Sequence, residues 1–249
     1  MERLFVTGDT HGKEDNEGLE KLRRFIIDHE WHIHPPKEKI YLIILGDFGY
    51  IFDGLCSIRK KLYPSIQEEM MLTYLESFKK YNMTVCFIPG NHENYERLKS
   101  EEFPVVGFKG GKAKKVRDNI YCLMRGEIYT ISNKTVFTFG GARSTDKYSR
   151  IENVEWWADE LPTQEEIDYA FDQLSKHHNQ VDYILTHCTS TSIESQFISR
   201  SRNHWTDALD LIYKKVNFKA AYFGHYHDDY SYTSNNKIYR CLYFDVIEI

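Results

Sequence analysis

Residues 4–12 of the chain, LFVTGDTHG, join a short apolar run directly to an aspartate and a histidine flanked by glycines. Similar junctions recur along the chain. Apolar runs end in ligand-type side chains at residues 40–47 (IYLIILGD), 85–93 (VCFIPGNHE), 181–187 (VDYILTH) and 220–227 (AAYFGHYH). Such runs predict buried strands, and the carboxyl ends of parallel strands are where open α/β sheets place their sites. We therefore expect the Asp, His and Asn side chains of these stretches to meet.

The segments between the strand-like runs alternate in character. In the first half, helical spacing at Glu17–His29 and Ile66–Tyr81 predicts parallel strand–helix–strand units. Further on, Thr163–His178, which opens with a Thr163–Glu166 capping box, and Trp205–Val216 are predicted helices. Short β-rich runs separated by turn residues predict hairpins in Val105–Phe139, and a closing hairpin from Tyr230–Thr233 and Lys237–Ile249. We find neither repeat nor linker, so residues 1–249 are predicted to form one domain with two sheets.

Composition excludes several classes of protein. The chain has 249 residues, 41% of them hydrophobic, and a formal net charge of −5, which argues against a disordered chain, a general DNA coat or a basic membrane-surface protein. No apolar stretch approaches the roughly 18–20 residues that cross a bilayer. Five scattered cysteines without a CxxC pair argue against a disulfide framework or a zinc knuckle. Together with the lack of a signal peptide, they predict a cytoplasmic protein.

The donor types at the strand ends suit a divalent metal. Carboxylate and imidazole ligands accept manganese, iron or zinc, and an aspartate between two ions can hold them roughly 3.5–4 Å apart. Each motif alone has a plain structural explanation, since Gly46-Asp47 by itself is an ordinary turn. The ordered set of motifs is much harder to explain without a metal.

This ordered set resembles the calcineurin-like metallophosphoesterase superfamily over the span from Asp9 to His227. The shared motifs are Asp-x-His, Gly-Asp, Gly-Asn-His-Glu, His and Gly-His-x-His. Residues 140–142 (Gly-Gly-Ala) and Trp156-Trp157 also resemble an uncharacterised bacterial and phage branch. The resemblance implies an α/β fold, a four-layer α/β/β/α sandwich of two mixed β-sheets, with two divalent metal ions at one end of the sheets. Manganese is expected first, and iron, zinc or nickel are alternatives.

The resemblance also implies a role for each motif residue. The first ion would be bound by Asp9, His11 and His227, and the second by Asn91, His187 and His225. Asp47 would bridge both ions, and His92 would face the substrate. A hydroxide bridging the ions would attack phosphorus, while His92 would protonate the leaving oxygen or stabilise its charge.

One motif departs from the protein Ser/Thr phosphatases of the superfamily. Those enzymes continue Gly-Asp with x-x-Asp-Arg-Gly, whereas this chain continues with FGYIF at residues 48–52. The departure argues against a protein phosphatase and against the related symmetric diadenosine tetraphosphate hydrolases. Arg143 and Arg150, in a glycine-led loop, are candidates to bind the phosphate instead, or are solvated. Four aromatic residues either stack on a nucleobase or pack in the core: Tyr50, Phe52, Trp156 and Trp157.

The other histidines and the basic residues have simpler explanations. We expect no metal at His29, His32, His34, His177, His178 or His204. A basic patch either contacts nucleic acid or, as we favour, forms a solvated hairpin; it comprises Lys109, Lys112, Lys114, Lys115 and Arg117. The same ambiguity holds for residues 199–202 (Ser-Arg-Ser-Arg).

The sequence thus favours a hydrolase that cleaves phosphomonoesters or phosphodiesters, acting on a small or nucleotide-like substrate. One alternative is a nuclease that acts on nucleic-acid ends, which the acidic net charge disfavours. An alternative of another class is a non-catalytic scaffold with the same fold. No membrane partner is expected, and the sequence does not indicate an oligomeric state.

Overall fold

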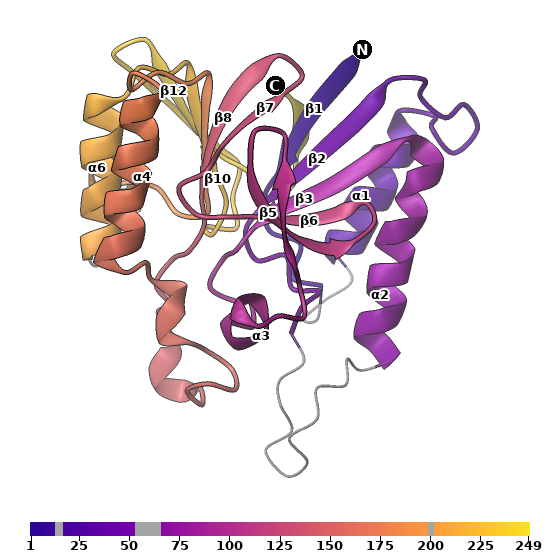
Figure 1. Cartoon of the computed structure of the whole chain (residues 1–249), viewed down its shortest axis with the longest axis horizontal. Coiled ribbons are helices and arrows are strands. Elements are labelled where there is room, and N and C mark those ends of the chain that lie inside the picture. The colour runs from indigo at the N-terminus through magenta and orange to yellow at the C-terminus, as the bar shows by residue number, and fades with distance from the viewer. Residues whose placement is uncertain (13–16, 53–65, 199–201) are drawn as a thin grey trace.

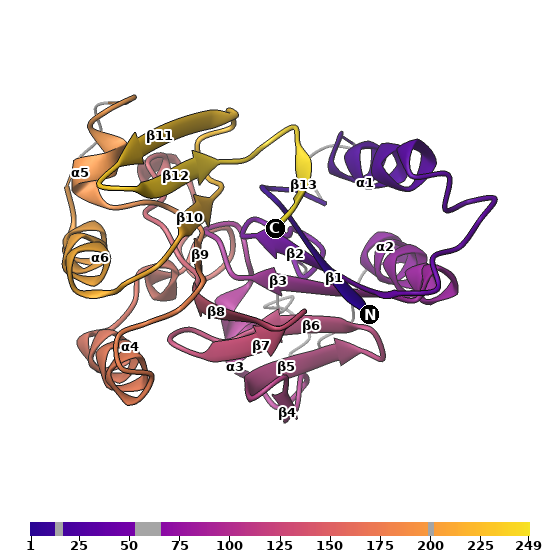
Figure 2. The ribbon, with the colours of Figure 1, turned by 90° about the horizontal axis from the view of Figure 1, so that it is seen from above.

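The computed structural model describes residues 1–12, 17–52, 66–198 and 202–249. Within them, two mixed sheets face each other and helices cover the outer face of each sheet (Figures 1 and 2). The seven-stranded sheet has the order β13 (Val246–Glu248), β1 (Glu2–Thr7), β2 (Lys39–Leu45), β3 (Met83–Ile88), β6 (Ile120–Leu123), β5 (Gly111–Arg117) and β4 (Val105–Phe108). The six-stranded sheet has the order β11 (Tyr230–Ser234), β12 (Lys237–Cys241), β10 (Ala220–Phe223), β9 (Tyr183–Thr186), β8 (Lys134–Phe139) and β7 (Ile128–Ile131).

Helices form the two outer layers. The seven-stranded sheet is covered by α1 (Glu17–Asp28) and α2 (Ile66–Glu76), which continues as the 3₁₀ turn η1 (Ser77–Tyr81). The six-stranded sheet is covered by α4 (Gln164–Lys176) and α6 (His204–Lys215). The short helical elements are α3 (Tyr95–Lys99), η2 (Lys147–Ser149), η3 (Ala158–Glu160) and α5 (Thr191–Glu194).

Alternation along the central strands divides the apolar side chains among three cores. In β1, Leu4 and Val6 point between the sheets, while Phe5 points toward the helices. In β2, Ile43 points between the sheets and Leu42 toward the helices. Full burial of each such side chain contributes about 1.5–3 kcal/mol to the free energy of folding. A third core lies between the six-stranded sheet and its helices, so the predicted α/β/β/α sandwich is confirmed.

The capping box predicted at the start of α4 is present. The Thr163 hydroxyl accepts from the Glu166 N–H at 3.2 Å, and the Glu166 carboxylate accepts from the Thr163 N–H at 2.9 Å. These two bonds satisfy N–H groups that have no partner inside the helix and fix where α4 begins.

The C-terminal tail differs from the prediction. A hairpin does form between β11 and β12, but the chain does not continue in that sheet to Ile249. It crosses to the other sheet instead, where β13 pairs antiparallel with β1 and Phe5 lies opposite Glu248. Tyr243 and Phe244, in the crossing, donate backbone hydrogen bonds to the Asp229 carboxylate. The tail therefore joins the two sheets rather than extending one of them.

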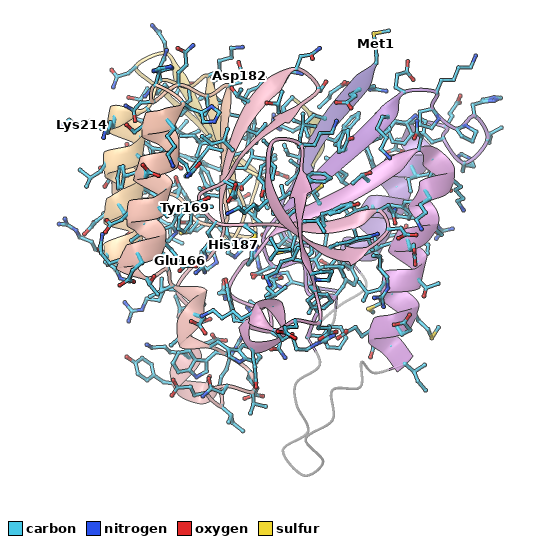
Figure 3. The ribbon with its side chains drawn as sticks, in the orientation of Figure 1. Met1, Glu166, Tyr169, Asp182, His187 and Lys214 are labelled. Carbon is cyan, nitrogen blue, oxygen red and sulfur yellow. The ribbon has the colours of Figure 1, made fainter. Side chains whose placement is uncertain are left out.

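Parallel pairing places the predicted ligand turns together. β1, β2 and β3 are parallel neighbours in one sheet, and β9 and β10 are parallel neighbours in the other. Figure 3 shows His187, which follows β9, near the centre of the molecule between the layers. Of the cysteines, Cys86, Cys122, Cys188 and Cys241 are free and buried. Cys56 and residues 199–201 lie outside the described residues.

Candidate metal centre

The turns after the strands hold their polar residues in an uncommon backbone conformation. The φ angles of His11, Asp47, His225 and His227 are 41°, 43°, 71° and 53°. A left-handed conformation at a residue other than glycine costs roughly 1–3 kcal/mol, and such strain concentrates at functional sites. The strain at these four residues agrees with a functional role for the turns that carry them.

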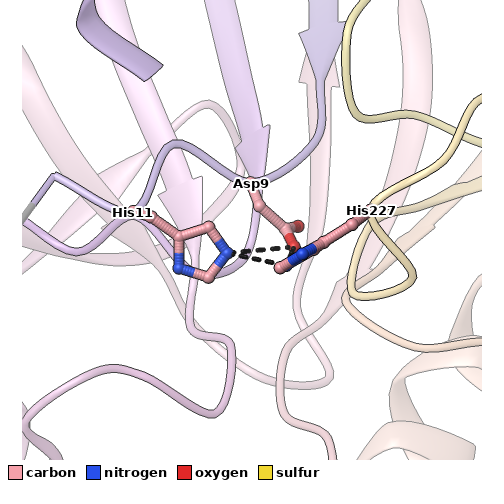
Figure 4. A group of neighbouring side chains, drawn as sticks. All are labelled: Asp9, His11 and His227. Carbon is pink, nitrogen blue, oxygen red and sulfur yellow. Dashed lines mark hydrogen bonds and ion pairs between the residues drawn. The ribbon is translucent and has the colours of Figure 1, made fainter. Parts of the chain in front are cut away.

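Asp9, His11 and His227 form the first group of possible ligands (Figure 4). The Nε2 atoms of His11 and His227 lie 2.9 Å apart. They also lie 3.6 and 3.3 Å, respectively, from Oδ2 of Asp9. Two ring nitrogens and a buried carboxylate oxygen thus converge. Asp9 and His11 share one turn, and His227 comes from another turn 216 positions from His11. This donor set fits a divalent cation.

Asp47, His187 and His225 form a second group, and Asn91 lies beside it. Nδ1 of His187 lies 2.7 Å from the Leu45 carbonyl oxygen, which only accepts, so Nδ1 carries a proton. Nε2 of His187 faces two further acceptors, Oδ1 of Asn91 at 3.1 Å and Oδ2 of Asp47 at 3.3 Å. A cation that replaced the proton on Nε2 would therefore face three electron-pair donors, namely Nε2 itself and these two oxygens.

The Asp47 carboxylate connects the two groups. Its Oδ2 lies 3.3 Å from Nε2 of His187 and 3.8 Å from Nε2 of His11. Its Oδ1 accepts backbone hydrogen bonds from Asn91 at 2.8 Å and His92 at 2.9 Å. One oxygen is thus held by the backbone, which leaves the other facing both histidines.

Two glycines are required by this crowding. A Cβ atom at Gly90 would lie 2.1 Å from Oδ1 of Asp47, and one at Gly224 would lie 2.2 Å from Oδ1 of Asp9. Neither distance allows a side chain without displacing the carboxylate. Glycine at these two positions therefore lets the backbone approach the carboxylates closely.

The charges of the buried groups show what the centre needs. Burial raises the pKa of Asp9, but its contacts with His11 and His227 outweigh that effect and lower it. Burial lowers the pKa of His187, but the nearby Asp47 carboxylate raises it to about 10. In the chain alone, one protonated imidazole offsets only one of the two buried carboxylate charges. A divalent ion that displaced this proton would replace one positive charge with two, which would neutralise both carboxylates.

His92 and Arg150 form the outer edge of the site. The ring of His92 lies beside that of His11, with centroids 5.2 Å apart. The Arg150 guanidinium lies against it, with contacts of 3.2 Å to Nδ1 and 3.4 Å to Nε2. Asp146 holds the same guanidinium at 2.7 Å. Arg150, predicted to bind substrate, therefore does lie beside the predicted catalytic histidine.

The remaining predicted residues are placed differently. Arg143 is half-buried and lines a small cleft with His225 and Tyr226, on the side of the second group. Tyr50, Phe52 and Trp157 are buried. Packing is therefore the explanation that the structure supports for these three rings, whereas Trp156 is half-buried.

Three buried polar residues near the centre carry interactions that the sequence did not reveal. Glu93 accepts from the backbone N–H groups of Gly49 and Gly90, which ties the turns after β2 and β3 together. Burial and the nearby Asp47 carboxylate raise the pKa of Glu93 to about 7. Ser144 and Glu160 form a hydrogen-bonded chain that ends on Asn91. Only Glu93 had a signal in the sequence, because it closes the Gly-Asn-His-Glu motif.

A cavity of about 740 Å³ extends beside the first group. It is lined by residues of the β1 turn, including Asp9 and His11, and by Arg24 and Phe25 of α1. Aromatic side chains of the C-terminal crossing close its other side. Its volume is in the range of pockets that bind small organic molecules.

Three of the five residues of the basic patch form ion pairs in the structure. Lys109 pairs with Glu2, Lys115 with Asp118 at 2.9 Å, and Arg117 with Glu69 at 2.7 Å. The patch spans the turn after β4 and the strand β5, as the hairpin prediction required. Ion pairing of these three residues reduces the positive field that a nucleic acid would meet.

The fold and the clustered Asp and His side chains define a metal-dependent hydrolase. A sequence model described as calcineurin-like phosphoesterase matches residues 2–229. The match spans most of the chain, and the chain belongs to this family, whose members act on phosphate esters. No curated protein matches the chain significantly. No helix in the described part of the chain is long and apolar enough to cross a bilayer.

Two solved structures resemble the chain distantly. The phosphopantetheinyl hydrolase of Mycobacterium tuberculosis is 14% identical with a TM-score of 0.42, over 97% of this chain and 89% of that one. GAP50, the anchor in the inner membrane complex of Plasmodium, is 12% identical with a TM-score of 0.49, over 97% of this chain and 71% of that one. These likenesses are too weak to carry an argument about chemistry.

Proposed function

We propose that the chain is a two-metal phosphoesterase that hydrolyses phosphomonoester or phosphodiester bonds of a small or nucleotide-like substrate. The observation that carries the proposal is the position of Oδ2 of Asp47, within 4 Å of Nε2 in both His11 and His187. A carboxylate shared by two groups of ligands is the arrangement that a pair of ions needs.

The proposed ligands follow the two groups. Asp47 would contact both ions; Asp9, His11 and His227 would hold the first, and Asn91, His187 and His225 the second. When bound, the ions would lower the pKa of a water molecule and neutralise charge on the phosphate. The oxygen and imidazole donors favour manganese, with iron, zinc or nickel as alternatives.

The substrate side of the site is assigned to His92 and two arginines. His92 would carry a proton on the ring nitrogen that faces the leaving oxygen and donate it as the ester bond breaks. Arg150, already against His92, would donate to a non-bridging phosphate oxygen in the bidentate manner of a guanidinium. Arg143 would contact the substrate from the side of His225.

Three features of the structure bear on substrate and compartment. The cavity of about 740 Å³ beside Asp9 and His11 has room for the organic part of a nucleotide-sized ester. The ion pairs of the basic patch make a nuclease the less favoured alternative. Free buried cysteines are typical of a reducing compartment, so we place the protein in the cytoplasm.

The test compares two model esters with the purified protein after manganese is added. We expect hydrolysis of p-nitrophenyl phosphate, bis(p-nitrophenyl) phosphate or both, and none after chelation. Activity on the diester alone would exclude a phosphatase, and activity on the monoester alone would exclude a nuclease. A protein that binds both ions yet hydrolyses neither ester would contradict the proposal and support the scaffold hypothesis.

A further inference from the structure

A chain of hydrogen bonds leads from Asn91 into the protein, on the side away from His187. The Asn91 amide nitrogen Nδ2 lies 3.1 Å from the Ser144 hydroxyl oxygen. That hydroxyl lies 2.7 Å from Oε2 of Glu160, and the Ser144 backbone N–H lies 2.8 Å from Oε1 of the same carboxylate. All three residues are buried, with exposed fractions of 4%, 1% and 2%.

The direction of each bond follows from the donors available. A carboxylate accepts, so both the backbone N–H and the hydroxyl of Ser144 donate to Glu160. A serine hydroxyl has one proton, and here that proton is committed to Glu160. Toward Asn91, Ser144 can therefore only accept, which requires the NH₂ group of Asn91 to point at it. The carbonyl oxygen of Asn91 must then point the opposite way, toward His187.

This orientation matters most when the centre is loaded. In the chain alone, the Asn91 carbonyl oxygen faces Nε2 of His187 at 3.1 Å. An ion bound there would remove the proton from Nε2, and that contact would no longer orient the amide. The bond to Ser144 lies on the other side of the amide, so an ion bound beside His187 would leave it in place.

We infer that Glu160 and Ser144 are positioning residues, which fix the Asn91 amide so that its oxygen faces the second ion. The inference rests on the proposed function, because it takes Asn91 as a ligand of that ion. It assigns a role to two residues of the segment that follows β8, Ser144 in the loop and Glu160 in η3. Outer-sphere partners of this kind typically contribute about tenfold to a hundredfold in metal affinity.

The anchoring of Glu160 supports the assignment. Its backbone carbonyl accepts from the Arg125 guanidinium at 3.0 Å, and Arg125 is itself paired with Glu166 at 2.9 Å. The carboxylate is thus carried on a segment tied to the start of α4. A residue can orient a metal ligand only if its own position is fixed, and these bonds fix the position of Glu160.

The experiment titrates the metal-free protein with Mn²⁺ by calorimetry and by electron paramagnetic resonance. For Ser144→Ala we expect one ion to bind as in the unsubstituted protein and the other to bind about tenfold to a hundredfold more weakly. When little Mn²⁺ has been added, the electron paramagnetic resonance spectrum of this variant should be that of a single ion rather than that of a coupled pair. Ser190→Ala is the matched control, because it removes a buried hydroxyl that caps Ile193 and does not contact Asn91.

Glu160→Gln provides an independent variant. A glutamine that keeps its oxygen on the Ser144 N–H places its NH₂ group against the hydroxyl, so Ser144 would donate to Asn91 and favour the flipped amide. We expect the same selective loss of the second ion, with melting temperatures recorded for all variants. If Ser144→Ala and Glu160→Gln bound both ions with the affinities of the unsubstituted protein, the inference would be overturned. Failure of the unsubstituted protein to bind two ions would instead overturn the proposed function.

Discussion

The two sides of the site are built in opposite ways. On the metal side, Asp9 and Asp47 are almost fully buried, in turns that follow directly on buried parallel strands. On the substrate side, Arg150 lies in a loop whose apolar side chains are exposed, 87% for Tyr148 and 63% for Ile151. The sandwich fixes the first side, whereas the second side lies on a surface loop in which Asp146 pairs with Arg150. The contrast fits our proposal, in which the strand-end turns bind the metal ions and the loop contacts the substrate.

The largest effect should come from the carboxylate that both groups share. Asp47→Asn removes one negative charge and one bridging oxygen, so we expect loss of both ions. The expected fall in kcat/KM is on the order of a thousandfold or more, because a metal pair contributes several kcal/mol to catalysis. Metal analysis and steady-state kinetics measure the two effects. Asp172→Asn, which breaks an exposed pair with Lys176, is the control and should change neither.

A second variant separates chemistry from metal binding. His92→Ala should keep both ions but lose about 10²- to 10⁴-fold in kcat, the usual contribution of a general acid. Kinetics together with metal content of the same sample decides the outcome. Loss of the metal along with the activity would place His92 among the ligands instead.

The two arginines should contribute unequally to catalysis. Arg150→Ala should reduce kcat/KM by about tenfold to a hundredfold, since a hydrogen bond to a charged group contributes about 1.5–3 kcal/mol. Arg150→Lys should recover only part of this loss, because an ammonium cannot reproduce a bidentate contact. Arg143→Ala provides the comparison. A larger loss for Arg143→Ala than for Arg150→Ala would reverse our assignment of the principal phosphate contact.

The smallest effect should come from the basic patch. Lys112→Ala combined with Lys114→Ala removes two positive charges from β5, and we expect less than about a twofold change in turnover of a small ester. The same variant is tested for binding to a short DNA duplex at low salt. A large loss of DNA binding, in a protein whose unsubstituted form binds and cleaves DNA, would favour the nuclease hypothesis.

The sequence predicted what depends on local pattern and strand order. Continuous apolar runs such as that of β2 are buried on both faces, so their strands and the positions at their ends were recognisable. The prediction for the C-terminal tail was wrong because β13 has only three residues. The sheet that β13 joins is decided by its pairing with β1 rather than by its own sequence pattern. A three-residue strand carries almost no periodic signal.

The partners of the site were harder to predict than its candidate ligands. Ser144 and Glu160 lie 16 positions apart in irregular chain and 3₁₀ turn, where no periodicity relates one residue to another. The contact between Arg150 and His92 spans 58 positions and depends on how the loop folds back. Such contacts are set by tertiary packing, which a pattern of residue types does not contain.

The central claim is that the turns at the strand ends build a two-ion centre. The most direct test is to strip the purified protein of metal, add Mn²⁺ in steps and record both the bound stoichiometry and the electron paramagnetic resonance spectrum. We predict two ions per chain at saturation and the signal of a magnetically coupled pair. Binding of one ion or none, or of two ions without coupling, would contradict the account.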